Sequence, residues 1–401
     1  MTELEKKYFP TKLAGYVGFT VQAIVNNFLP ILFIVFQDIY GLGYEKLGRL
    51  IVFNFATQMI IDFLTPKIIH KIGYRRAAFL CQFTACLGLC LMAVLPHIMS
   101  NTYLAIILSI TVYATGSGLM EVILSPMIEM LPTGNKSANM AVLHSFYCWG
   151  QTVVVPLTTA MVFVFGGDNW SYIPLVWAIV PFINMFAFLF VPIVEPGKEE
   201  KQATFFELLK TPKFIIYMVM MFCAGASEIA MSQWASLFVE QALGVSKAVG
   251  DITGPCLFAL FMALGRVIYA KFSKKVSFTR LLIWLNILCL VCYVTVALCK
   301  IAAVSLLFCA LCGFSVSISW PGIYSAGART FKNGGAVMFS AFAMCGDTGC
   351  ALGPGLVGLV AEYTNLNIGF LAAAIFPFAM VICSLIILKN KVAKEKIHSI
   401  I

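Results

Sequence analysis

Long apolar runs separated by short polar segments organise this 401-residue chain. A helix needs about 20 apolar residues to cross the hydrocarbon of a bilayer, and twelve runs reach this length without the alternation of a membrane β-strand. Because only helices or closed barrels satisfy backbone polar groups in lipid, the pattern predicts an all-α membrane protein with twelve transmembrane helices. The runs lie near residues 13–37, 47–69, 77–97, 102–131, 138–166, 172–194, 213–239, 249–270, 279–299, 302–328, 335–361 and 368–388.

A basic motif occurs twice, each time between two apolar runs. The two copies are 204 residues apart and read Asp62-x4-Lys67-x3-Lys71-x4-Arg76 and Arg266-x4-Lys271-x3-Lys275-x4-Arg280. Glycine and proline recur with them, as Gly118-x7-Pro126 and Gly313-x7-Pro321, and as Gly150-Gln151 and Gly346-Asp347. Since duplicated bundles build many secondary transporters, we expect two pseudo-symmetric six-helix bundles. They comprise residues 1–194 and 213–401, joined by a cytoplasmic linker at residues 195–212.

The basic residues are distributed unevenly between the two sides of the membrane. If the N-terminus is cytoplasmic and every run crosses once, the cytoplasmic segments hold 22 Lys and Arg residues. The outer segments then hold four, and Arg266 lies inside a helix. Cytoplasmic loops carry the excess of basic residues in membrane proteins. We therefore expect a multi-pass protein of the cell membrane with both termini in the cytoplasm.

Composition narrows the class of protein further. The chain is 61% hydrophobic and 11% charged, against roughly 25% charged in a soluble domain, so the lipid bilayer must be one of its partners. The net charge of +9 comes from short clusters rather than from one basic face, which argues against nucleic acid as a partner. Two CxxC pairs, at Cys289 and Cys309, lie in apolar runs without a nearby His. We therefore expect no metal site and no cofactor.

The polar segment after the second run carries a family resemblance. It reads Pro66-x3-His70-Lys71-Ile72-Gly73-Tyr74-Arg75-Arg76. This resembles the helix 2–3 loop of the major facilitator superfamily, G-x-x-x-D-[RK]-x-G-x-[RK]-[RK], and the twelve runs in two halves fit that family. Pro66 stands where Gly is usual, and His70 where Asp is usual. In the family this Asp latches one conformation, so the resemblance does not carry that latch over to this chain.

Three runs resemble one group within the superfamily, the fucose–galactose–glucose:proton symporters. The fourth run holds Gly116-x-Gly118-x2-Glu121-x3-Ser125-Pro126, which resembles the group's G-x-G-x-x-E-x3-N-P. His144 in the fifth run occupies a position that the group fills with Gln or His, and Gly225-x2-Glu228 followed by Trp234 resembles helix seven of relatives. Helix one of the group carries an acid next to Asn. This chain has Asn26-Asn27 there, so the coupling role of that acid is not transferred.

Ionisable residues inside the runs are candidates for function, because a charge near the bilayer centre costs at least ~2.5 kcal/mol. At about 1.5 Å of rise per residue, Glu121, Glu228 and Asp347 fall near the midplane, where transporters hold substrate. The resemblance implies that Glu121 and Glu228 face a central cavity from opposite halves. We assign coupling or gating to these three acids. For each of them an interhelical hydrogen bond is the structural alternative.

A polar stripe and one buried cation complete the gating candidates. Asn54, Gln58 and Asp62 recur every four residues and so share one face of a helix. They indicate either a gate between helices two and eleven or a packing seam. Arg266 lies about one turn from the cytoplasmic end of its helix and needs an acid. Asp62 and Glu129 are at a compatible depth, so we predict an ion pair there that breaks and reforms during transport.

The expected substrate-binding residues are polar and aromatic side chains on helices one, four, five and seven. The ordinary pKa of His, about 6.5, suits a proton relay, although a structural hydrogen bond explains His144 equally well. Trp234 leads the aromatic candidates because it follows Glu228 by six residues and sugar rings stack on aromatic faces. The set comprises Asn26, Asn27, Glu121, His144, Gln151, Glu228, Gln233 and Trp234.

These features predict a secondary active transporter that moves a small polar solute, a sugar, by alternating access. The expected coupling ion is a proton, with sodium as the alternative. An efflux carrier for amphipathic organic compounds is the second hypothesis, although the polar side chains favour a hydroxyl-rich solute. We expect no enzyme, because the four His are scattered and no nucleophile–base pair occurs. A non-transporting sensor stays open, and we expect the chain to act as a monomer.

Overall fold

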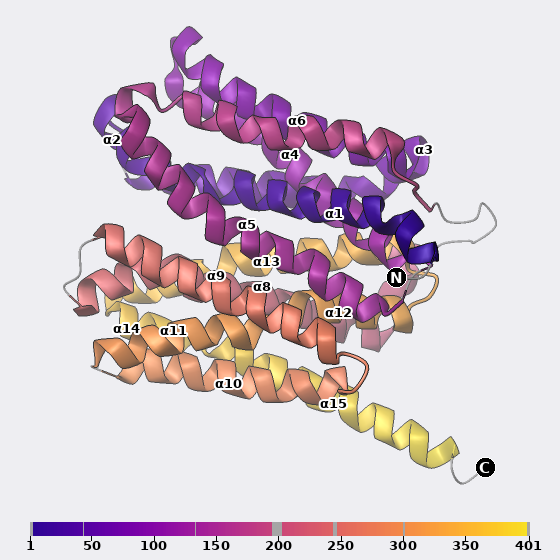
Figure 1. The fold of residues 1–401 in the computed structure, drawn as a ribbon. Coiled ribbons are helices and arrows are strands. Elements are labelled where there is room, and N and C mark those ends of the chain that lie inside the picture. Colours follow the sequence, from indigo (N-terminus) through magenta and orange to yellow (C-terminus); the bar gives the residue numbers. More distant parts are fainter. Residues whose placement is uncertain are drawn as a thin grey trace. The chain divides into compact units, whose positions relative to one another are not determined.

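The structure, a computed structural model, describes residues 3–42, 44–132, 134–194, 203–243, 247–299 and 301–398. The chain in these ranges is built from helices joined by short connections (Figure 1). The α-helices are α1 (Glu3–Asn27), α2 (Phe33–Tyr40), α3 (Tyr44–Ile98), α4 (Thr102–Glu129), α5 (Lys136–Phe165), α6 (Tyr172–Phe190), α7 (Phe205–Leu209), α8 (Pro212–Leu243), α9 (Lys247–Phe272), α10 (Phe278–Leu298), α11 (Ala302–Val316), α12 (Ser319–Thr330), α13 (Gly335–Tyr363), α14 (Leu366–Ala373) and α15 (Ile375–His398). Two 3₁₀ helices, η1 (Leu29–Leu32) and η2 (Gly167–Asn169), accompany them.

Polar side chains fix the starts of several helices. Asn101, Asn135 and Asn365 each precede a helix and accept a hydrogen bond from a backbone N–H in its first turn, which satisfies a donor that has no partner within the helix. Thr204 and Glu207 form a reciprocal capping box at α7. This short helix lies at the end of the predicted linker, of which residues 195–202 lie outside the described ranges.

Ten helical segments in the described ranges are long and apolar enough to cross a membrane. Nine of them each match one predicted run, and the tenth, Arg49–Ile98, covers two predicted runs. Within that segment Gly73 has φ 77° and ψ 164°, outside the helical region, so two helices meet there. Glycine adopts such a positive φ without steric cost, and Gly73 belongs to the predicted basic loop. The all-helical membrane class is thus confirmed, while the number of twelve spans stays a prediction.

The first predicted run, residues 13–37, is divided among three helical pieces in the structure. The helix α1 ends at Asn27, and η1 and α2 continue the chain instead of one unbroken helix. Pro30 has no N–H to donate to the carbonyl of Asn26, so an α-helix cannot pass through this point undisturbed. None of the ten segments among the described residues includes this run.

Contacts between residues divide the chain into two compact units. Unit 1 comprises Met1–Asn139, Phe146–Gln202 and Asn333–Met344, and unit 2 comprises Met140–Ser145, Ala203–Lys332 and Cys345–Ile401. The units follow the two halves of the sequence except for residues 140–145 in α5 and 333–344 at the start of α13. These two helices therefore each contribute to both units. The predicted division into six-helix bundles at residues 195–212 stays a prediction.

Matching glycines make matching helix contacts in the two units. In unit 1 a Cβ on Gly118 of α4 would lie 2.9 Å from the carbonyl oxygen of Gln58 in α3. In unit 2 a Cβ on Gly313 of α11 would overlap the carbonyl oxygen of Phe258 in α9. Such close approach of two backbones is a common use of glycine in membrane helices. The repeated glycine of the sequence therefore serves the same contact in each unit.

Two glycines of α13 provide a test of this packing. Gly349 lies against the backbone of Phe222 and Ala226 in α8, whereas a Cβ on Gly355 would meet nothing within 4 Å. We expect Gly349→Ala to destabilise the protein by roughly 1–3 kcal/mol through overpacking. The matched change Gly355→Ala should leave stability unchanged or raise it, because alanine favours a helix by about 1 kcal/mol. Thermal unfolding of both variants in detergent checks this. Equal unfolding midpoints would contradict the assigned contact.

Basic residues gather at one end of unit 1. Lys12 near the start of α1 donates to the side chain of Asn139 in α5 at 2.9 Å. Arg75, two residues after the break in α3, donates to the carbonyls of Phe188 and Leu189 at 3.0 and 2.7 Å. A guanidinium at the end of a helix satisfies carbonyls that have no intrahelical partner. These contacts bring the start of α1, the loop at Gly73, the start of α5 and the end of α6 to the same end.

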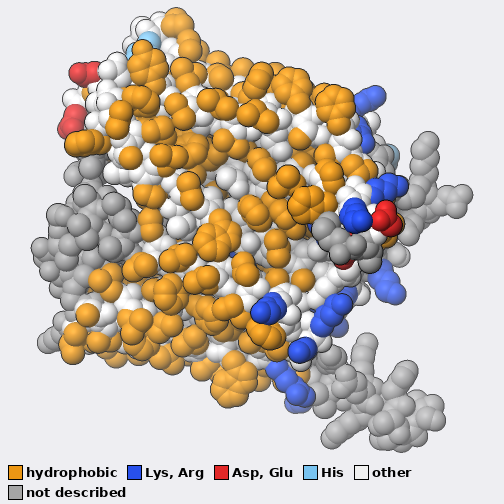
Figure 2. Space-filling view, viewed as in Figure 1, with side chains coloured by type: hydrophobic (Ala, Val, Ile, Leu, Met, Phe, Trp, Pro, Cys, Tyr) orange, Lys and Arg blue, Asp and Glu red, His pale blue; other side chains and the backbone are white. Residues whose placement is uncertain are grey.

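Unit 2 has a corresponding end. The ring of Phe331, after α12, packs on Phe214 and Tyr217 of α8, with centroid distances of 5.3 and 5.7 Å. Tyr269 of α9 and Phe278 of α10 lie 6.5 Å apart by the same measure. The basic residues in these segments are Lys213, Lys271, Lys274, Lys275, Arg280, Arg329 and Lys332. In Figure 2 the Lys and Arg side chains lie at helix ends, while apolar side chains cover the lengths of the helices.

Large apolar side chains are exposed along the helices. Phe163, Phe190 and Trp284 expose 91%, 83% and 70% of their surface. Exposure of this kind over many helices is costly in water but suits contact with acyl chains, which are as apolar as the side chains themselves. The outward-facing surfaces of the helices thus agree with a multi-pass membrane protein.

Candidate functional site

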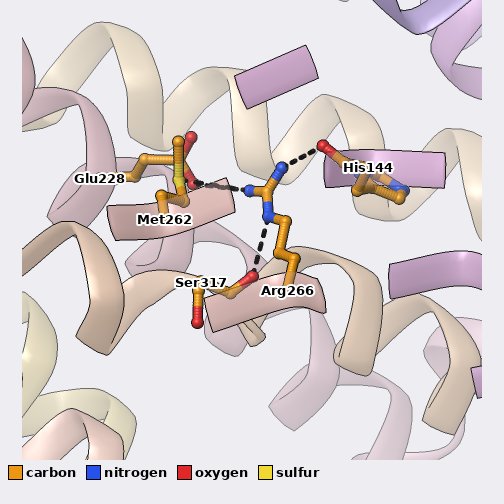
Figure 3. Close-up of polar contacts among 5 residues, drawn as sticks. All are labelled: His144, Glu228, Met262, Arg266 and Ser317. Carbon is orange, nitrogen blue, oxygen red and sulfur yellow. Dashed lines mark hydrogen bonds and ion pairs between the residues drawn. The ribbon is translucent and has the colours of Figure 1, made fainter. Parts of the chain in front are cut away.

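A buried arginine contacts polar groups from several helices of unit 2. Arg266 of α9 is only 2% exposed. Its Nε donates to the carbonyl of Ser317 at 2.9 Å and its Nη1 donates to the carbonyl of His144. Its Nη2 lies 3.4 Å from the sulfur of Met262 and 3.5 Å from a carboxylate oxygen of Glu228 (Figure 3). The guanidinium therefore connects α5, α8, α9 and the junction after α11.

The carbonyl of Ser317 is available to Arg266 because of a proline. In a continuous helix this carbonyl would accept a hydrogen bond from residue 321, but Pro321 has no N–H. The chain breaks here between α11 and α12, and the next carbonyl along, that of Ile318, accepts from Gly322 at 2.9 Å. A charged donor at the vacant acceptor satisfies a carbonyl that would otherwise be costly to bury. Pro321 of the Gly313-x7-Pro321 pattern thus leaves an acceptor to which Arg266 can donate.

Glu228 supplies the charge partner of Arg266. It is 5% exposed and lies on α8. The carboxylate that the structure places beside Arg266 is that of Glu228, whereas depth along the helices favoured Asp62 or Glu129, a pairing that stays a prediction. Counting residues from the end of a run gives depth along one helix axis. It gives neither the face from which a side chain leaves nor the direction of a long arginine side chain. Removing one member of such a buried pair leaves an uncompensated charge.

His144 takes part in the cluster in two ways. Its backbone carbonyl accepts from Arg266, and its ring lies 5.6 Å from the ring of Tyr324 in α12 at an interplanar angle of 31°. Both side chains are buried, with exposures of 4% and 0%. The sequence analysis identified the side chain of His144 as a candidate, but neither its carbonyl nor Tyr324. Tyr324 could have been identified from its spacing, because it follows Pro321 by three residues and lies on the same helix face.

A second polar network lies in unit 1. The side-chain oxygen of Asn26 in α1 accepts from the amides of Asn54 and Gln58 in α3, both at 3.1 Å. Ser117 of α4 donates to the side-chain oxygen of Gln58 at 2.8 Å. The polar stripe therefore faces protein, where its hydrogen bonds join three helices. Asp62, the last member of the stripe, is fully buried.

Glu121 has an amide partner that sequence reasoning missed. The Nε2 of Gln22 in α1 donates to its carboxylate at 2.9 Å, and the two side chains are 3% and 7% exposed. Gln22 precedes Asn26 by four residues, so both lie on one face of α1. The same spacing that revealed Asn54 and Gln58 could have revealed Gln22. Asn27, the next candidate, donates to the carbonyl of Ala23 at 2.8 Å and lies 3.5 Å from the hydroxyl of Tyr147.

The remaining candidates lie on α5, α8 and α13. Gln151 in α5 and Asp347 in α13 are buried, with exposures of 9% and 6%. Gln233 in α8 is exposed, and the half-buried Trp234 donates its indole N–H to the carbonyl of Pro354 at 3.0 Å. In unit 2 the structure thus brings together His144, Glu228 and Arg266, while Trp234 makes a separate contact with Pro354.

Comparisons with known proteins agree with this arrangement of helices. A curated membrane protein of Rhizobium meliloti, MosC, is 22% identical over 331 residues, which is 82% of this chain and 79% of MosC. A variant of the E. coli fucose:proton symporter FucP superposes with a TM-score of 0.78 at 15% identity, covering 95% of this chain and 99% of FucP. The proton:xylose symporter XylE superposes with a TM-score of 0.82 at 12% identity and covers 96% of each chain.

The family assignment comes from the sequence itself. The family model of the Major Facilitator Superfamily matches residues 15–354. This range includes the basic loop at Gly73, the Gly118 and Gly313 contacts, and both polar networks. The structural likenesses, at such low identity, add the fold and nothing more. On this evidence the chain is a transporter rather than an enzyme, and it belongs to the Major Facilitator Superfamily.

Proposed function

We propose that this chain is a proton-coupled carrier for a small neutral polar solute, a sugar, which it moves across the cell membrane by alternating access. The observation that carries the proposal is a buried acid on a membrane helix in each unit, Glu121 in unit 1 and Glu228 in unit 2. Ionisable residues at such positions usually serve transport, because their burial is costly. The structural likeness to FucP and XylE, which are described as proton symporters for fucose and xylose, favours a sugar as the solute.

The partners of the two acids suggest different roles. Glu228 lies beside a guanidinium, so adding a proton to it would remove the counter-charge of a buried cation. Glu121 accepts from the neutral amide of Gln22, and a protonated carboxyl group can still accept through its carbonyl oxygen. Glu121 is therefore the better proton carrier. Glu228 is better suited to hold Arg266 in place.

The surroundings of Arg266 favour a solute without a negative charge. All three nitrogens of its guanidinium have protein partners, namely two backbone carbonyls, a sulfur and the carboxylate of Glu228. An anionic solute would have to displace these contacts to use the charge. The amides of Asn26, Asn54 and Gln58 in unit 1 are instead groups that exchange hydrogen bonds readily with hydroxyls.

The orientation in the membrane follows from the basic ends. In each unit most Lys and Arg residues lie near one set of helix ends, those at the start of α1, the break in α3 and the end of α6 in unit 1, and those at the start of α8, the end of α9 and the end of α12 in unit 2. Because basic segments stay in the cytoplasm, we place these ends, and both termini of the chain, on the cytoplasmic side.

Uptake by proteoliposomes tests the function directly. The purified protein is reconstituted and offered a panel of labelled sugars, with and without an imposed pH or sodium gradient. We expect one or more sugars to accumulate only under the pH gradient. Accumulation under a sodium gradient alone would show that sodium, and not the proton, is the coupling ion. If no sugar is transported, efflux of amphipathic compounds becomes the better hypothesis. If no compound shows counterflow, the chain would be a sensor that does not transport.

A further inference from the structure

Two sets of hydrogen bonds join α1 to α4 in unit 1. In the first, the Nε2 of Gln22 donates to the Oε2 of Glu121 at 2.9 Å. In the second, Ser117 donates to Gln58 of α3 at 2.8 Å, and Gln58 donates to Asn26 at 3.1 Å. Asn26 lies one turn after Gln22 on α1, and Ser117 lies one turn before Glu121 on α4. The two sets therefore occupy successive turns of the same helix pair, in an antiparallel register.

The backbone that carries Gln22 is held on another side by α5. A Cβ on Gly150 of α5 would lie only 2.7 Å from the Cβ of Ala23, so the two helices approach closely there. The rings of Tyr16 in α1 and Phe146 in α5 stack with a centroid distance of 4.6 Å. Because α1 is packed against α5 in this way, the position from which Gln22 reaches α4 is fixed as well.

The hydrogen bond between Gln22 and Glu121 is shielded from water, since the two side chains are only 3% and 7% exposed. In such surroundings a hydrogen bond is stronger and its loss costs more. An amide N–H donates at any pH, and a carboxyl group with a proton on one oxygen still accepts at the other. While Oε2 accepts from Gln22, the proton is therefore favoured at Oε1. The contact thus selects the oxygen at which the acid takes up its proton.

We propose that Gln22 is a positioning residue for the proton carrier: its amide orients the carboxyl group of Glu121 so that the proton is taken up and released at Oε1. Gln22 itself neither gains nor loses a proton, and it acts only through Glu121. Its role rests on the proposed function, because it requires Glu121 to carry a proton. Gln22 lies outside the predicted set of binding and coupling residues.

Infrared difference spectroscopy of the full chain in lipid nanodiscs, between basic and acidic pH, tests this role. A protonated carboxyl group gives a separate C=O stretching band, and the band that Glu121→Gln removes belongs to Glu121. We expect the nearly isosteric variant Gln22→Met to keep this band, but to move it to higher frequency and to broaden it. The carbonyl then lacks its amide donor, and either oxygen can take the proton. A loss of stability alone would leave the frequency of the band unchanged.

Gln82→Met is the matched control. Gln82 of α3 is also a fully buried glutamine of unit 1, but its amide lies 3.8 Å from the sulfur of Cys81 in its own helix. This variant should leave the Glu121 band at its wild-type frequency. If Gln22→Met does not fold, Gln22→Asn takes its place. Its amide is one methylene further from Glu121, so the same shift of the band is expected.

Three results would overturn the role of Gln22. If Glu121→Gln removes no band of a protonated carboxyl group, Glu121 takes up no proton, and the proposed coupling fails together with the role of Gln22. If the band is present but Gln22→Met leaves its frequency unchanged, only the role of Gln22 fails, and proton coupling through Glu121 stands. An equal shift in Gln82→Met would show that the band responds to general packing of unit 1 rather than to the amide of Gln22.

Discussion

Replacing Glu121 by Gln is expected to abolish accumulation of the solute against its gradient while leaving exchange partly intact. The amide has nearly the same shape and can still bond Gln22, but it cannot take up or release a proton. With one pH unit imposed, coupling to one proton allows about tenfold accumulation. We expect the accumulation ratio of Glu121→Gln to fall to about one, measured with labelled solute in proteoliposomes.

A matched variant separates loss of coupling from loss of folding. Ser109 lies on the same helix, is fully buried, and bonds the carbonyl of Ala105 within α4. Ser109→Ala should retain accumulation. Counterflow, which needs no gradient, should remain measurable in Glu121→Gln. If this variant accumulates solute as well as the wild type does, Glu121 is not the proton carrier.

Replacing Arg266 by Met is expected to cause the largest loss of stability. The change leaves the carboxylate of Glu228 buried without its cation and removes the donors for Ser317 and His144. Breaking a buried ion pair in this way costs about 3–5 kcal/mol. Thermal unfolding in detergent, followed by tryptophan fluorescence, measures the effect. The exposed Arg280 of α10 is the control, and Arg280→Met should change stability by less than about 0.5 kcal/mol.

A double variant identifies the source of the loss. Glu228→Gln removes the charge that Arg266→Met would leave alone, so the two changes together should cost less than their sum. Full additivity would show that the two charges do not stabilise one another. A more stable Arg266→Met protein would contradict the central position given to the guanidinium in unit 2.

The helical class and most span positions could be predicted from the sequence because each depends on local chemistry. An apolar run of sufficient length has few alternatives to a membrane helix. Gly73 in its basic loop also marks where α3 is interrupted. The first run could not be placed as well, since its hydropathy does not register the missing N–H of Pro30. That proline permits a break but does not by itself predict one, since α4 and α5 continue through Pro126 and Pro156.

The burial of the candidate residues could be predicted more reliably than their partners. Burial of Asp62, Glu121, Glu228, Arg266 and Asp347 followed from their positions within apolar runs. The pairing of Arg266 with Glu228, and of Glu121 with Gln22, did not follow. A partner depends on which faces of two helices meet, and residue spacing within either helix does not contain that information. Their roles in binding and coupling stay predictions until transport is measured.

The sequence by itself determined the membrane class, the repeat and the family, because hydropathy, spacing and motif are properties of the chain read in order. Only the tertiary structure decided which side chains of other helices bond the carbonyls that the prolines leave open. Pro66 and Pro321 each remove one donor, a change visible in the sequence. That Ser340 and Arg266 donate to the open carbonyls, those of Asp62 and Ser317, depends on helices distant along the chain lying side by side. Helix packing, which sums many weak contacts between such segments, sets that arrangement.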